Sequence, residues 1–455
     1  MISFLTLGGG NEIGANSYYL NFDGTGIILD AGMDPVKKGW DALPDFSLIG
    51  KDPVDHLLIS HAHQDHISAL PYAVKSFPYI KTWMTPQTVS LADLTLHNST
   101  EIMKDQMKDE KDFVIYDHDE ITMLLKTFND TRYSIPFDIT GYVHENSSAV
   151  TAEFYDAGHV LGSSAILLSS GGRTVFYTGD INLSDQAVMQ KAVLPPFDID
   201  TLILECTYGS TDSRTLPLWN DESNRLATSL NKIISGGGST LIPVFSLGKT
   251  QEMLATIWTL MQKGEIANVP IYTGGLSRKI TRLYDRNRYI VNFNDPDFAL
   301  TKIPALNIRA VEDLDDLFKE PCIILAASGM VIPGTMSYKL AERFLRRKNS
   351  AVFTIGYMDE NSPGYRIANA ATGDTIRLQE TSEEIKIQCT VKKFRFSAHA
   401  KREELLSIVQ SLHPKNVILV HGEPDSINWL GAGILRHDKN IKVYSAVKGK
   451  KMLIA

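Results

Sequence analysis

The chain has 455 residues, of which 43% are hydrophobic and 22% charged, and its formal net charge is −8. These values fit a globular protein of two or three domains and exclude a surface coated in basic residues, so any nucleic acid must bind in a local groove. The sequence has neither a long apolar run nor a signal peptide, so we expect no membrane-spanning helix. Three cysteines without C-x-x-C spacing argue against a disulfide framework and make a reducing cytoplasm the expected location.

The first predicted elements are short strands around a glycine-rich loop. Residues 3–7 form a strand candidate, and residues 8–14 form a loop where backbone can approach other groups closely. Residues 16–22 and 26–29 then predict a hairpin. Its second strand ends in Asp30, which is either an ordinary turn residue or a carboxylate that orients the histidines that follow.

Three histidines and an aspartate follow the next apolar strand, residues 54–59, in the pattern H-x-H-x-D-H. His61 and His63 lie two positions apart, so an extended backbone points both imidazoles the same way, whereas Asp65 and His66 project to a second point. A helix over residues 67–74 completes a stiff platform. Four side chains cannot close two coordination spheres, so further ligands are expected downstream.

Polar residues at later strand ends supply these candidates. Residues 86–125 have helical spacing, and their two histidines, His97 and His118, are interpreted as ordinary surface residues. His159 lies in a glycine-flanked turn, Asp180 ends the strand that begins at 174, and Glu205 ends the apolar run 201–204. Each side chain lies at a strand end, where residues from several strands of a sheet can meet at one site.

The middle of the chain, from about 210 to 381, alternates helices with short strands and predicts an α/β domain with a largely parallel sheet. Gly248 and Lys249 suggest a phosphate-binding P-loop, but Pro243 stands where that motif needs glycine. Strand character returns at 385–391, and His399 and His421 then follow strand candidates.

These side chains together indicate a metal centre. Six of the twelve histidines fall in the strand-end motifs, and His and Asp ligands without cysteine suit zinc, with manganese or iron as alternatives. Two ions about 3.5–4 Å apart would generate a hydroxide near neutral pH. We assign His61, His63 and His159 to one ion, Asp65, His66 and His421 to the other, and Asp180 as the bridge.

The ligand pattern resembles the metallo-β-lactamase superfamily. Glu205, His399 and His421 match motifs A, B and C of its β-CASP nuclease branch, which includes ribonuclease J and the nuclease subunit of the cleavage and polyadenylation specificity factor. Further stretches that look like family signatures are residues 7–14, 204–209, 242–252, 327–330 and 396–400. One departure is Lys249, where the family carries arginine.

The resemblance implies an α/β fold: an αββα metallo-β-lactamase sandwich (residues 1–208 and 381–455) with an inserted α/β β-CASP domain (209–380). It also implies a di-zinc ribonuclease, as endonuclease, 5′-exonuclease or both. His399 would be general acid for the leaving oxygen, oriented by Glu205, and Asp65 is counted with them as catalytic. A histidine at position 421 favours RNA over DNA.

Single-stranded RNA is the expected partner, with a homodimer or an RNA-processing complex as further possibilities. The basic and polar residues expected to bind it are Lys249, Arg278, Lys279, Arg366 and Ser397. For the basic run 343–348, a solvated helix face and an RNA contact are equally acceptable interpretations. Two other functions stay open: a non-catalytic RNA-binding scaffold, and hydrolysis of a small ester on the same metal site.

Overall fold

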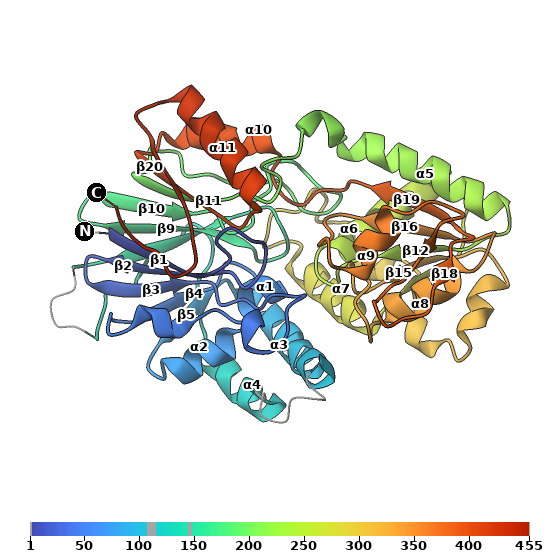
Figure 1. Cartoon of the computed structure of the whole chain (residues 1–455), viewed down its shortest axis with the longest axis horizontal. Coiled ribbons are helices and arrows are strands. Elements are labelled where there is room, and N and C mark those ends of the chain that lie inside the picture. The colour runs from blue at the N-terminus through green and yellow to red at the C-terminus, as the bar shows by residue number, and fades with distance from the viewer. Residues whose placement is uncertain (1, 107–114, 144–147, 455) are drawn as a thin grey trace. The chain divides into compact units, whose positions relative to one another are not determined.

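The computed structural model describes residues 2–106, 115–143 and 148–454 (Figure 1). The chain forms two compact units. The first contains Met1–Ser184, Lys191–Thr215 and His399–Ala455, and the second contains Asp185–Gln190 and Leu216–Ala398. Among the described residues, no helix is both long and apolar enough to cross a membrane.

The first unit contains two seven-stranded sheets. One has the order β22 (Lys451–Ile454), β1 (Ile2–Gly8), β2 (Ser17–Phe22), β3 (Thr25–Leu29), β4 (His56–Leu58), β5 (Lys81–Met84) and β6 (Asn129–Asp130). The other has the order β21 (Lys442–Ser445), β20 (Asn416–Val420), β11 (Thr201–Glu205), β10 (Arg173–Tyr177), β9 (Ser164–Ser170), β8 (Thr151–Asp156) and β7 (Phe137–Asp138).

Alternation of apolar side chains along the strands builds a sandwich. In β1, Phe4 faces a core shared with Phe154 and Ile203 of the second sheet, whereas Leu5 faces the opposite way. The outer face of the first sheet packs on α1 (Gln64–Ile67), α2 (Leu70–Ser76), α3 (Pro86–Gln106) and α4 (His118–Leu124). The second sheet packs on α10 (Arg402–Leu412) and α11 (Pro424–His437). This is the predicted αββα arrangement, seen in Figure 1.

The second unit is built on a parallel sheet. Its order is β14 (Leu306–Asn307), β13 (Ile271–Thr273), β15 (Ile323–Ala326), β12 (Thr240–Pro243), β16 (Ala351–Ile355) and β19 (Thr390–Phe394). Every neighbouring pair in this sheet runs parallel. Its helices are α5 (Trp219–Ser235), α6 (Lys249–Gln262), α7 (Gly275–Asn287), α8 (Met336–Leu345) and α9 (Pro363–Ala368), and β17 (Thr375–Ile376) pairs with β18 (Ile385–Lys386).

The unit boundaries differ from the expected domain boundaries. The chain rejoins the first unit at His399, not at 381, because β19 pairs in parallel with β16 and so belongs to the second sheet. The expected strand 385–391 is divided between β18 and β19. Residues 185–190, expected in the first domain, pair with the second unit, where Met189 bridges to Phe293. Part of the expected helical stretch 86–125, residues 107–114, lies outside the described residues.

Candidate metal centre

The seven predicted metal ligands come together in the first unit, at strand ends. His61 and His63 follow β4, and Asp65 and His66 lie in the short helix α1. The other three follow β8, β10 and β20: His159, Asp180 and His421. All except His63 and Asp65 are buried.

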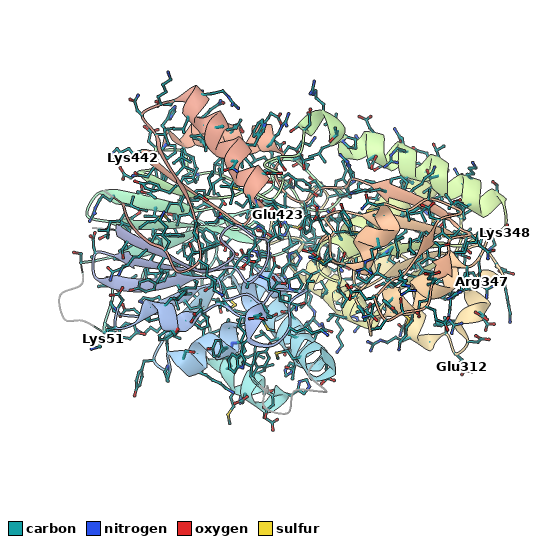
Figure 2. All side chains as sticks on the ribbon, in the orientation of Figure 1. Lys51, Glu312, Arg347, Lys348, Glu423 and Lys442 are labelled. Carbon is teal, nitrogen blue, oxygen red and sulfur yellow. The ribbon has the colours of Figure 1, made fainter. Side chains whose placement is uncertain are left out.

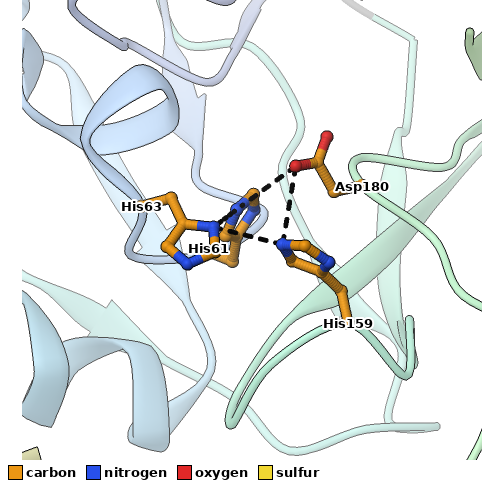
Figure 3. Close-up of side chains that lie close together, drawn as sticks. All are labelled: His61, His63, His159 and Asp180. Atoms are coloured by element: carbon orange, nitrogen blue, oxygen red, sulfur yellow. Dashed lines mark hydrogen bonds and ion pairs between the residues drawn. The ribbon is translucent and has the colours of Figure 1, made fainter. Parts of the chain in front are cut away.

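The first cluster contains three imidazoles and one carboxylate (Figure 3). His63 Nδ1 lies 3.0 Å from His61 Nε2 and 3.1 Å from His159 Nε2. Asp180 Oδ2 lies 3.7 Å from His61 Nε2 and 3.6 Å from His159 Nε2. These ligand atoms all lie within 4.8 Å of one another, so they surround a single point.

The second cluster contains Asp65, His66 and His421. Asp65 Oδ2 lies 3.5 Å from the Nε2 atoms of both His66 and His421. The other oxygen of Asp180, Oδ1, lies 3.3 Å from His66 Nε2 and 3.2 Å from His421 Nδ1. Asp180 thus directs one oxygen to each cluster, the position that the bridging hypothesis requires.

The chemistry of these atoms fits metal binding. Asp180 Oδ1 and His421 Nε2 are buried and lack a hydrogen-bond partner among the described residues, which is costly unless a cation satisfies them. Burial lowers the pKa of His61 well below its usual range, so this imidazole keeps a free lone pair. Burial alone would raise the pKa of Asp180, but His421 and His66 lower it well below its usual range. Burial alone would lower the pKa of His66, but Asp180, Asp65 and Asp30 raise it well above its usual range, so a cation bound there would displace a proton. Ionised carboxylates beside imidazole nitrogens make a suitable donor set for a divalent cation.

Asp30 contacts His66 of the second cluster, as its interpretation as an orienting carboxylate requires. Its buried carboxylate lies 2.8 Å from His66 Nδ1 and accepts hydrogen bonds from the Tyr177 hydroxyl (2.6 Å) and from Ser60, through N–H (2.6 Å) and hydroxyl (2.7 Å). A carboxylate on Nδ1 fixes the tautomer and leaves Nε2 free as a ligand. The backbone of Gly32 also touches the ligand loop, where a Cβ would lie 1.6 Å from the Asp65 carbonyl oxygen.

Several contact residues were missed from sequence. Asn16 Nδ2 lies 3.1 Å from His66 Nε2 and 3.4 Å from Asp65 Oδ2, and Thr207 Oγ1 lies 3.1 Å from His421 Nδ1. The glycine-rich loop that ends just before Asn16 was the available signal, since it marked a close backbone approach. Ser60 and Tyr177 carried no such signal.

Glu205 and His399 form a pair beside the clusters. His399 Nδ1 lies 3.0 Å from Glu205 Oε1, and His399 Nε2 lies 3.9 Å from Asp180 Oδ2. The Glu205 carboxylate is buried and also accepts the N–H groups of Ile181 (3.1 Å) and Thr207 (3.0 Å). A fixed carboxylate therefore orients an imidazole that keeps partial access to solvent.

The predicted RNA-binding residues belong to the second unit. Arg278 donates to the Ala305 carbonyl at 2.5 Å, Arg366 donates to the Arg377 carbonyl at 3.2 Å, and Lys279 is exposed. Lys249 is buried, and burial lowers its pKa to about 8. Ser397 is half-buried. RNA binding by these five residues stays a prediction.

The basic run at the end of α8 is engaged within the second unit. Arg343 and Arg347 both contact Asp315 Oδ1, at 3.2 Å and 3.1 Å, and Arg347 lies over the Phe318 ring. Figure 2 labels Arg347 and Lys348 at this end of the helix. These contacts favour the interpretation as a solvated helix face.

His97 and His118, interpreted as ordinary surface residues, are both partly exposed and contact each other. Their Nδ1 atoms lie 2.7 Å apart, and His118 Nε2 lies 2.6 Å from Glu101. The pair forms because α4 packs against α3, a contact that helical spacing alone does not predict.

Family profiles match three parts of the chain: the metallo-beta-lactamase superfamily domain at 19–199, the Beta-Casp domain at 250–367, and the Zn-dependent metallo-hydrolase RNA specificity domain at 384–445. The chain belongs to the metallo-β-lactamase superfamily, in its β-CASP branch. The resemblance inferred from the motifs is therefore confirmed.

Two named proteins are similar to nearly the whole chain. Cleavage and polyadenylation specificity factor 73 of Drosophila melanogaster is 30% identical over 96% of this chain and 62% of its own length. Endoribonuclease ysh1 of Emericella nidulans is 30% identical over 97% of this chain and 53% of its own length. The chain thus spans a little over half the length of these relatives.

One solved structure has a similar fold. It is a protein of unknown function from Enterococcus faecalis V583, with a TM-score of 0.58 and 13% identity over 100% of both chains. At this identity the likeness concerns the fold alone.

Proposed function

We propose that this β-CASP protein is a metal-dependent ribonuclease that hydrolyses RNA phosphodiester bonds. The observation that carries the proposal is the Glu205–His399 pair beside the two His/Asp clusters. A metal centre alone serves many hydrolytic reactions of the superfamily, but a poor alkoxide leaving group needs a proton donor as well. The names of the similar proteins, an endoribonuclease and a cleavage factor, support the same reaction.

Two zinc ions are the proposed cofactors, with manganese as the alternative. His61, His63 and His159 would hold one ion, Asp65, His66 and His421 the other, and Asp180 would touch both. Bound there, the ions would supply Lewis-acid polarisation of a phosphate and a water of lowered pKa.

The chain's own residues provide the remaining chemistry. With Nδ1 directed at Glu205, His399 presents Nε2 toward the clusters, and we assign to that atom the proton given to the leaving oxygen. Glu205 acts through His399 by fixing its tautomer and stabilising the imidazolium. Asp65 contacts His66 and His421 and holds the two imidazoles of the second cluster in position.

Single-stranded RNA is the proposed substrate, and an RNA-processing complex is the proposed setting. The similarity to a cleavage and polyadenylation factor and the RNA specificity domain support this proposal. A homodimer and a cytoplasmic location are further proposals, to be tested by light scattering and by cell fractionation.

The decisive experiment digests labelled linear and circular RNA with and without a chelator. We expect metal-dependent cleavage, and cleavage of the circle would identify endonuclease action. His399→Ala should lower kcat by about 100- to 10,000-fold, because it removes the general acid. His413→Ala serves as the control, because it removes an exposed histidine of the same unit whose Nδ1 lies 3.1 Å from Asp198 Oδ1 at the surface. A His399→Ala enzyme as active as the parent would remove the acid from the proposal.

A further inference from the structure

A cavity of about 1130 Å³ lies in the first unit, outside the metal clusters. Its walls come from segments that follow three strands: residues 10–12 after β1, residues 37–45 after β3, and residues 447–448 after β21. Tyr72 of α2 completes the lining. β1 and β3 belong to the first sheet and β21 to the second, so the cavity lies where strand ends of both sheets meet. Ligand sites are concave and few per protein, and the proposed function does not use this one.

Trp40 is the dominant aromatic group of the cavity. It is 63% exposed although the Tyr72 ring lies edge-on to it, with centroids 5.8 Å apart and an interplanar angle of 63°. Tyr72 is held in turn by the buried Phe46 ring at 5.2 Å. The indole is therefore supported from one side while most of its surface faces solvent. Such an aromatic platform suits stacking by a nucleobase.

The charged side chains of the cavity fall into two groups. Three are engaged: Lys37 pairs with Glu12, and Asp45 accepts the N–H of Ser47 at 3.1 Å. The other three have no ion pair or side-chain hydrogen bond within the described part of the chain: Lys38, Asp41 and Lys448. Two ammonium groups are thus available to a phosphate, and one carboxylate is available to N–H donors.

One loop borders both the cavity and the metal clusters. The Gly9 carbonyl accepts the backbone N–H of His421 at 3.0 Å, and the Asn16 backbone N–H donates to the Asp65 carbonyl at 2.9 Å. Between these two anchors, residues 10–12 line the cavity. The two ends of this loop therefore contact the residues His421 and Asp65 of the second cluster, and its middle lines the cavity.

We propose that the cavity binds one nucleotide of single-stranded RNA away from the bond that is cut. Its base stacks on Trp40, and the phosphates on its 5′ and 3′ sides contact Lys38 and Lys448. The two oxygens of Asp41 suit the adjacent N–H groups of guanine, so guanine is the preferred base. The inference rests on the proposed function, since it takes RNA as the substrate.

Binding of a short labelled single-stranded RNA, measured by fluorescence anisotropy with chelator present, tests the stacking. Trp40→Ala should raise Kd by about 5- to 150-fold, the usual effect of losing one stacked base, whereas Trp40→Phe should retain most of the affinity. Tyr79→Ala is the matched control, because Tyr79 is 85% exposed in the same unit but does not line the cavity.

The salt dependence of Kd tests the phosphate contacts. Lys38→Ala and Lys448→Ala should each reduce the slope of log Kd against log salt by about 0.7, the value for one contact to a single strand. Lys51→Ala, an exposed lysine of the first unit labelled in Figure 2, should leave the slope unchanged. Replacing guanine by uracil throughout the probe should weaken binding to the parent protein but not to Asp41→Ala.

The outcomes separate this inference from the proposed function. If the parent cuts RNA and Trp40→Ala binds RNA as tightly as the parent, the cavity proposal is overturned while the nuclease stands. If the parent cuts no RNA but binds it, and Trp40→Ala weakens that binding, the cavity proposal stands without the nuclease. Unchanged salt slopes in both lysine variants would also overturn it.

Discussion

Replacing Asp30 by asparagine should weaken metal binding without disturbing any ligand atom directly. Asp30 is buried; its Oδ1 accepts one hydrogen bond, and its Oδ2 meets three donors, from Ser60, Tyr177 and His66. An asparagine can keep its oxygen at the three-donor position only by turning its NH₂ group toward the Ser60 backbone N–H. The backbone φ of Asp30 is 60°, a value that asparagine also tolerates, so the effect of the substitution comes from the side chain and not from backbone strain.

Two magnitudes follow from this geometry. One buried N–H loses a charged acceptor, which costs about 1.5–3 kcal/mol of unfolding free energy in the metal-free protein. His66 also loses the carboxylate that fixes its tautomer, and losses of this kind lower metal affinity by about 10- to 100-fold. Urea unfolding with chelator measures the first quantity, and competition with a chromophoric chelator measures the second.

Asp55→Asn is the matched control in the same unit. Asp55 is equally buried, but its carboxylate accepts the backbone N–H groups of Gly26, Tyr142 and Val143 instead of orienting a ligand. Asp55→Asn should therefore lose stability and keep the parent's metal affinity. If both variants lost stability equally and Asp30→Asn bound metal as tightly as the parent, the orienting role of Asp30 would be refuted.

Two further predictions concern the ligand loop and a buried carboxylate. Gly32→Ala places a Cβ against the Asp65 backbone, so it should lower the free energy of unfolding by about 3 kcal/mol and reduce the zinc bound per protein, measured by mass spectrometry. The control Gly431→Ala in α11, whose nearest neighbours lie at 3.6 Å, should change neither quantity. Equal zinc content in the two variants would contradict this prediction. Burial raises the pKa of Glu252 to about 7, so its contribution to stability is full below its unfolded pKa and is lost as pH rises through 7. Between pH 5 and 7, the free energy of unfolding of Glu252→Gln, measured in urea, should rise by about 1–3 kcal/mol relative to that of the parent. The exposed control Glu265→Gln should show no such rise. Parallel pH profiles for the parent and Glu252→Gln would rule out this account.

The ligand residues could be predicted because their chemistry is unusual at strand ends. The H-x-H-x-D-H loop stands out in any sequence, and His159, Asp180 and His421 each follow an apolar run. Their convergence follows from topology, since β8, β10, β11 and β20 all run in one direction and end at one edge of the sheet. Ligand residues that are far apart in the sequence could therefore be predicted to meet, because each follows a strand and these strands run in the same direction.

The contacts around the ligands could not be predicted in the same way. Tyr177 and Ser60 look like ordinary strand and loop residues until Asp30 lies between them. The division of the compact units at His399 has the same origin: residues 385–391 look like one alternating stretch, and only the pairing with β16 places β19 in the second sheet. Such features depend on which distant partner a strand finds, and hydrophobic spacing does not encode that choice.

The six residues Asp185–Gln190 limit how the second unit can be transplanted. A cassette cut at 216 and 398 would leave behind the piece that supplies the Met189–Phe293 bridge and the Val188 and Met189 N–H groups bound by Glu252. In isolation, the Glu252 carboxylate would lose these two backbone donors, and Phe293 would lose its bridge partner. A graft of this unit onto another scaffold must therefore include residues 185–190 as a second, shorter segment besides residues 216–398.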